Sequence, residues 1–295
     1  MISFLPVPPD VPGLWVRVAA AVLFTAAAAY FDLFNKKWVP NGLLYGFAAA
    51  AVLANVVFWG PVSIQALAFG VAAFLLAYPL YRMGQLGGAD VFAIASIAAT
   101  VPYFQSPLLA PAQQVQYPFV LSVMVPTSIF FILHMLVRFI PYICGKLTRG
   151  ELEITMAKAA GPAILAVSFA AFLAVLLSMP LQLPFAYLAL LSFLFAALLF
   201  FSFFKDDIKA SMVQRVPVSR LMEEDVVALE NMDGGLVRKL RLHPLLDAKE
   251  IAALKKSKVK SVPVYTGMPF FLPYLLAGLI ATLLFGDLLL YVIAF

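Results

Sequence analysis

Long apolar stretches dominate this sequence of 295 residues and limit what it can fold into. Hydrophobic residues make up 64% of the chain and charged residues only 12%, whereas a soluble domain has about 25% charged residues. A helix that crosses a membrane needs roughly 20 mostly apolar residues. Stretches of that kind occur at residues 12–34, 40–59, 63–83, 88–104, 118–142, 160–179, 183–204 and 269–291. We therefore predict an all-α polytopic membrane protein with about eight transmembrane helices.

Basic residues are distributed unevenly among the predicted connections. If the N-terminus lies outside, the outside links near residue 60, at 105–117 and near residue 182 hold no lysine or arginine. The inside links hold Lys36, Lys37, Arg82, Lys146, Arg149, Lys158 and the segment 205–265. This is the positive-inside pattern of membrane proteins, with Arg17 as the main exception. Both termini should then lie outside. The apolar composition implies membrane lipid as a partner, and the net charge of +5 needs no nucleic-acid partner.

The segment before the last apolar stretch differs in kind from the rest. It holds twelve of the 20 basic residues and nine of the 15 acidic ones. A turn is predicted at 232–235, a helix from Asp247 with Glu250 completing a capping box, and a strand at 257–265. We expect a small α/β cytoplasmic domain at 205–266, inserted between a membrane domain at 1–204 and a C-terminal transmembrane helix at 267–295.

Three acidic residues lie at the edges of apolar stretches, namely Asp32, Asp90 and Asp287. A carboxylate at the centre of a membrane helix costs roughly 2.5 to 3.5 kcal/mol, so such residues are functional candidates. Asp32 ends the first stretch and Asp90 begins the fourth, so alternating directions put both at the cytoplasmic end. Asp287 falls at the opposite end, as an outer-rim residue.

Two carboxylates in one site of low dielectric constant share a proton. The ionised one can activate water as a general base, and the protonated one can act as a general acid. The alternative is that each is a helix-end residue: Asp90 favoured by the dipole of its helix, and Asp32 a neighbour of Lys36. Spacing alone leaves both interpretations open.

Glycines precede the second of these acids, in the sequence GQLGGADVFAIASIAA at 84–99. A loop without bulky side chains would let an extended peptide approach the backbone beside Asp90, although a flexible turn between helices has the same composition. One cysteine, and two histidines without a carboxylate cluster, predict no metal site, and we expect no cofactor.

Two segments resemble the motifs of a known family. YFDLFNKKWVPNGL at 30–43 resembles the first aspartate motif of type IV prepilin peptidases, and GGAD at 87–90 resembles the GxGD motif of intramembrane aspartyl proteases. The third motif position is alanine, and Phe92 stands where many relatives have a lysine. The cytoplasmic insert, PVYTGMPFFLPYLLAG and the final FGDLLLYVIAF resemble the archaeal preflagellin peptidase branch.

This resemblance implies an aspartic endopeptidase that removes the short basic leader of preflagellin or pilin-like precursors at the cytoplasmic face. The residues that it implies are the catalytic pair Asp32 and Asp90 and the motif positions Gly87, Gly88, Ala89, Pro40 and Asn41. A presenilin-like GxGD protease fits less well, because Phe31 precedes Asp32 and Ile164 follows Pro162-Ala163. A proton-coupled transporter would carry acids near the midplane and inverted repeats, whereas here the acids lie at one end and no repeat is evident.

Overall fold

The computed structural model describes residues 10–35, 38–113, 115, 117–152, 155–179, 184–223, 225–257, 259–266, 269–288 and 290. The chain forms two compact units. The first contains the four N-terminal helices together with the chain from Ala210 to Leu276, and the second contains most of the remaining helices.

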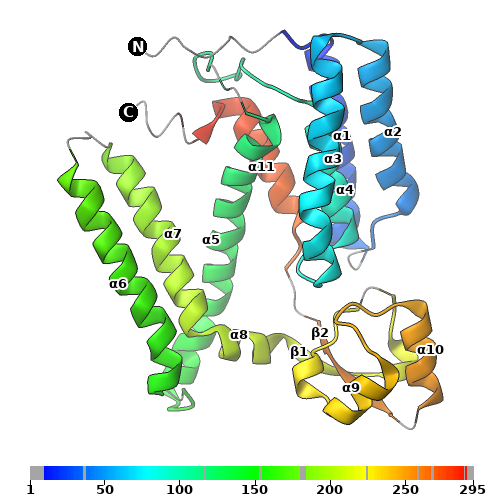
Figure 1. Cartoon of the computed structure of the whole chain (residues 1–295), viewed down its shortest axis with the longest axis vertical. Helices are drawn as coiled ribbons and strands as arrows, with labels where there is room; N and C mark the ends of the chain where they lie inside the picture. The colour runs from blue at the N-terminus through cyan, green and yellow to red at the C-terminus, as the bar shows by residue number, and fades with distance from the viewer. Residues whose placement is uncertain are drawn as a thin grey trace. The chain divides into compact units, whose positions relative to one another are not determined.

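Four apolar helices form the N-terminal part of the first unit (Figure 1): α1 Leu14–Phe34, α2 Asn41–Val57, α3 Pro61–Arg82 and α4 Gly88–Thr100. Helix α4 contacts the other three, and eight of its ten residues from Val91 to Thr100 are buried. A helix surrounded by neighbours must be apolar on every side. Close packing also requires small residues, since a Cβ atom at Gly70 of α3 would lie 2.7 Å from the Cβ atom of Ala99.

The other apolar helices are α5 Phe119–Thr148, α6 Met156–Ser178, α7 Phe185–Phe203 and α11 Leu272–Phe285. Within the second unit α6 packs against α7, with the rings of Phe169 and Phe195 stacked at 3.7 Å between centroids. Among the residues that the structure describes, five helices (α1, α3, α5, α6 and α7) are long and apolar enough to cross a membrane, while α2, α4 and α11 are apolar but shorter. The protein is thus a mainly helical, multi-pass membrane protein, as predicted; that all eight apolar helices cross the membrane remains a prediction.

An ion-pair cluster fixes the start of the next helix, α8 Lys205–Met212, within the second unit. Asp207 lies 2.6 Å from Nζ of Lys146 in α5 and 3.8 Å from Nζ of Lys158 in α6. Two of the basic residues that the charge pattern assigns to inside links therefore lie together with this acid.

A small module follows, with one helix–sheet core. It consists of β1 Val213–Pro217, α9 Gly234–Leu240, α10 Ala248–Lys256, β2 Ser261–Tyr265 and the 3-10 turns Val218–Arg220 and Leu229–Asn231. The strands pair antiparallel, with Val213 opposite Tyr265 and Pro217 opposite Ser261. The buried core comprises Val218, Leu221, Val227, Leu242, Leu246, Ile251, Leu254, Val262 and Val264.

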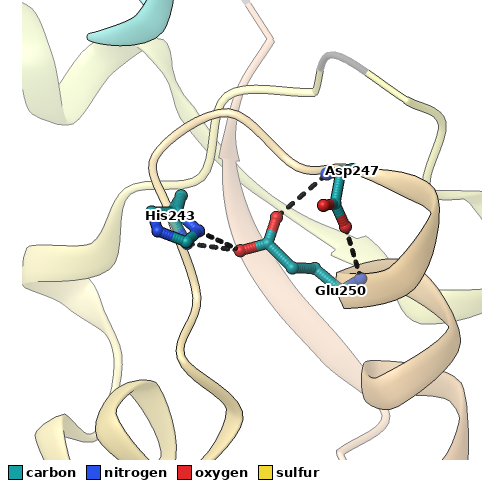
Figure 2. Close-up of polar contacts among 3 residues, drawn as sticks. All are labelled: His243, Asp247 and Glu250. Atoms are coloured by element: carbon teal, nitrogen blue, oxygen red, sulfur yellow. Dashed lines mark hydrogen bonds and ion pairs between the residues drawn. The ribbon is translucent and has the colours of Figure 1, made fainter.

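The predicted capping box begins α10, as Figure 2 shows. Oδ1 of Asp247 accepts a hydrogen bond from the backbone N–H of Glu250 at 2.7 Å, and Oε2 of Glu250 accepts one from that of Asp247 at 2.9 Å. Oε1 of Glu250 also accepts from the backbone N–H of His243 and lies 2.7 Å from Nδ1 of its ring. These bonds occupy both oxygens of a buried carboxylate, which satisfies its requirement for partners.

Candidate active site

Asp32 belongs to the packed face of α1. The buried residues of this helix recur every three or four positions, at Arg17, Val18, Ala21, Thr25, Ala28, Ala29 and Asp32. This spacing places them along one side of a helix. Asp32 is only 7% exposed and ends this stripe. Its carboxylate therefore points to the interior of the helix group, which the interpretation of Asp32 as a helix-end neighbour of Lys36 did not predict.

Asp90 lies in the first turn of α4 and is half-buried. Its Oδ2 accepts a hydrogen bond of 2.9 Å from the backbone N–H of Gly87, the residue that precedes the helix. The carboxylate thus has the favourable place for a negative charge at a helix N-terminus. This hydrogen bond agrees with the helix-end interpretation of Asp90, and it also fixes the position of one carboxylate oxygen of Asp90.

The connection before α4 depends on glycine at two positions. Gly84 has φ 70°, a backbone conformation that residues other than glycine rarely adopt. At Gly87 the backbone angles suit any residue, but a Cβ atom would lie 3.2 Å from Oδ2 of Asp90. The glycine at this motif position therefore leaves space for the carboxylate itself. Gly88 and Ala89 form the first two positions of the helix.

The two aspartates lie at the same end of the four-helix group. The side chain of Arg17, near the start of α1, donates a hydrogen bond of 3.1 Å to the carbonyl of Thr100, the last residue of α4. The start of α1 is thus beside the end of α4, and the helices, which contact each other, run in opposite directions. Asp32 lies about four turns beyond Arg17, and Asp90 about three turns before Thr100.

The predicted motif residues Pro40 and Asn41 lie at the start of α2, where Asn41 is the first helical residue. Pro40 precedes the helix with φ −59°, and its carbonyl accepts from the N–H groups of Leu43 and Leu44. The turn from α1 is closed by Asn35, whose Nδ2 donates to the carbonyl of Trp38 at 2.9 Å. The predicted basic pair Lys36–Lys37 lies outside the described residues.

Phe92, at the position where many relatives have a lysine, belongs to an aromatic cluster. Its ring lies 5.7 Å from that of Tyr45 in α2 and 5.8 Å from that of Phe74 in α3, measured between centroids. Both contacts are edge-to-face, the geometry that aromatic pairs prefer. The side of α4 that carries Phe92, two residues after Asp90, is therefore apolar.

Asp287 belongs to a separate cluster in the second unit. It is 2% exposed and accepts a hydrogen bond from the hydroxyl of Tyr117, while its backbone N–H donates to Oε1 of Gln113 at 2.6 Å. Burial, and then the Asp287 carboxylate, raise the pKa of Tyr117 above its ordinary value, so that its hydroxyl stays a donor. These bonds hold the loop before α5 to the end of α11, a structural role. Sequence reasoning missed Tyr117 and Gln113, because no local pattern links them to Asp287.

Metal chemistry has no donor set in the part of the chain that the structure describes. No three His, Cys, Asp or Glu side chains gather there in a group that could hold an ion. What the described residues do bring to one end of a helix group is a buried carboxylate, a half-buried carboxylate and a glycine connection. The apolar helices make the chain a multi-pass membrane protein, and the two carboxylates form its candidate site.

Comparison with protein families gives a match over part of the chain. The model of the type IV leader peptidase family matches residues 19–137, which include both aspartates. This segment belongs to that family, as the motif resemblance predicts, and the family implies a peptidase that processes precursor proteins. Searches of curated proteins and of solved structures give no match.

Proposed function

We propose that this protein is an intramembrane aspartyl endopeptidase in which Asp32 and Asp90 form the catalytic pair. The observation that carries the proposal is their common position. Asp32 ends the buried stripe of α1, and Asp90 begins α4, which is packed against α1 in the opposite direction. The family match over the same helices supports it.

The chemistry follows from one proton shared between two carboxyl groups. The ionised carboxylate takes a proton from a water molecule, whose oxygen attacks the carbonyl carbon of the scissile peptide bond. The protonated carboxyl donates its hydrogen to the carbonyl oxygen, which stabilises the tetrahedral intermediate. The C–N bond then breaks, and the leaving nitrogen takes up a proton from the pair. The product is one carboxyl and one amino terminus, without a covalent enzyme intermediate.

We infer that the substrate is a preflagellin or pilin-like precursor, cut between a short basic leader and the hydrophobic segment that follows. The positive-inside pattern would place both aspartates at the cytoplasmic face, where such a leader lies. The small residues before Asp90 leave the backbone accessible to an extended chain.

A cleavage assay tests this function. The purified protein in liposomes is mixed with a membrane-anchored precursor that carries a basic leader, and the products are measured by intact mass. We expect one cut before the hydrophobic segment, and slower cleavage when the basic residues of the leader are replaced by serine. A transporter would be supported instead if no basic-leader precursor were cut and if the liposomes took up protons in a way that depended on the acidic side chains of the protein.

Gly87→Ala is expected to slow this cleavage about tenfold without unfolding the protein. The new Cβ atom would lie 3.2 Å from Oδ2 of Asp90 and displace that carboxylate by a few tenths of an ångström. Misplacement of a catalytic group by about 1 Å costs about 100-fold in rate. The matched control is Gly42→Ala in α2, where nothing lies within 4 Å of the added atom. Equal rates for the two variants would contradict this role of Gly87.

A further inference from the structure

A buried arginine holds the ends of three helices together at the end of the group opposite the aspartates. Arg17 of α1 is 0% exposed. Its Nη1 donates to Oδ1 of Asn55 at 2.9 Å and to the carbonyl of Thr100 at 3.1 Å. Its Nη2 donates to the carbonyl of Ala54 at 3.1 Å, and its Nε donates to that of Pro12 at 2.9 Å.

Asn55 completes this arrangement, and we call the pair the Arg17–Asn55 clamp. The Nδ2 group of Asn55 donates to the carbonyl of Ala51 in its own helix at 2.9 Å and to that of Ala99 in α4 at 2.8 Å. Asn55 is also 0% exposed. Its amide therefore links α2 to α4, while its oxygen accepts from α1.

The clamp is placed where a cation is stable without a carboxylate. The salt bridges among the described residues do not include Arg17. Its partners instead include the carbonyls of Ala54 and Thr100 in the last turns of α2 and α4, which carry the negative ends of the helix dipoles. The planar guanidinium presents five donors in a fixed arrangement. Bonds to several carbonyls at once therefore allow little sliding of α1 along α4.

We propose that Arg17 is a positioning residue that sets the axial register of α1 against α4, and with it the relative height of Asp32 and Asp90. An α-helix is stiff and rises about 1.5 Å per residue. A register fixed at Arg17 and Thr100 is thus transmitted along both helices to the aspartates. The effect on catalysis depends on the proposed function, whereas the effect on register does not.

Dipolar EPR tests the register without any substrate. Spin labels are attached at Leu33→Cys near the end of α1 and Ala89→Cys at the start of α4, in a Cys144→Ser background that removes the natural cysteine. Arg17→Met is expected to broaden the distance distribution between the labels or to shift it by about 1.5 to 3 Å, which is one or two residues of helical rise. An unchanged distribution would overturn the proposal. If Arg17→Met does not fold, Asn55→Ala is the second variant, with the same expectation.

Kinetics then separate positioning from general stability. At equal folded fraction, Arg17→Met should lower kcat at least about tenfold with KM within about twofold, and Arg17→Lys should recover part of kcat. The control is Phe47→Ala, which removes a buried ring stacked on Phe24 between α1 and α2 and leaves the clamp intact. It should keep kcat within about twofold of wild type. Equal losses of kcat in Arg17→Met and Phe47→Ala would show that the clamp contributes only to packing.

Absence of cleavage by wild type would refute the proposed function but not the role of Arg17 in helix register, because the EPR distances are measured without substrate.

Discussion

Asp32→Asn is expected to fold, to unfold at a temperature no lower than that of wild type, and to cleave a precursor at least about 100-fold more slowly. Asp32 ends the buried stripe of α1 and is 7% exposed. Asparagine has nearly the same shape as aspartate. It carries no charge, so the unfavourable burial of a charge is avoided. The variant loses the proton transfers of the carboxyl group, which contribute about 100-fold to 10,000-fold to such a reaction.

Thermal unfolding in detergent and the initial rate of cleavage measure the two effects on one preparation. The matched control is Thr25→Val, two turns earlier in the same buried stripe. Thr25 is 0% exposed, and its hydroxyl has no hydrogen-bond partner among the described residues, so valine should preserve the rate. A wild-type rate for Asp32→Asn would contradict the catalytic role, and a large fall in its unfolding temperature would point to a structural one.

Gly278→Ala is expected to lower the free energy of unfolding by about 3 kcal/mol, the upper end of the usual cost of overpacking. A Cβ atom at this position would lie 2.0 Å from Oγ1 of Thr127, 2.7 Å from the backbone nitrogen of Thr127 and 2.9 Å from the carbonyl oxygen of Val123. Two of these atoms are backbone atoms of α5, so a change of side-chain rotamer cannot relieve the contact. Close approach of two helix backbones requires a small residue at the point of contact.

Thermal unfolding of Gly278→Ala and of Gly145→Ala checks this expectation. Gly145 lies in α5, and nothing lies within 4 Å of an added Cβ atom there. Alanine in a helix interior is favoured over glycine by roughly 0.5 to 1 kcal/mol, so this control should be as stable as wild type or more stable. If both variants unfold like wild type, α11 and α5 do not pack at Gly278 as described.

Features that are local in sequence were predictable from it. An apolar stretch long enough for a helix marks each of the eight apolar helices, although α4 ends at Thr100 rather than Phe104. The Asp247–Glu250 cap was predictable because its two residues are three apart. The position of Asp90 at the start of α4 was predictable because Asp90 begins the fourth apolar stretch.

Features that depend on long-range contacts were not predictable. Arg17 was visible only as an exception to the charge pattern, because its partners Asn55 and Thr100 are 38 and 83 residues away. Its position on the same helix face as Asp32, and a second polar residue in the next apolar stretch, were the available signals. Strand β1 also escaped prediction, because its partner β2 lies 44 or more residues further along the chain.

The candidate site likewise has features that the sequence predicts and features that it does not. Motif resemblance selected Asp32 and Asp90, and helix direction put them at one end. Sequence could not show that the Asp32 carboxylate faces the interior, because the burial of Asp32 depends on the packing of α1 against other helices. The contact between Gly87 and Asp90 joins residues three apart and is local, yet the sequence does not predict it, because the glycines indicate only a loop that a substrate could approach or a flexible turn.

The most direct test of the central claim compares initial cleavage rates of wild type, Asp32→Asn, Asp90→Asn and Asp287→Asn on one basic-leader precursor. The proteins are matched for folded fraction by gel filtration in detergent. Asparagine at position 90 retains an oxygen that can accept from Gly87, so this variant should fold. We predict a loss of at least about 100-fold for the first two variants and a wild-type rate for Asp287→Asn, whose bonds to Tyr117 and Gln113 are structural. Full cleavage by either Asp32→Asn or Asp90→Asn would contradict the aspartyl mechanism.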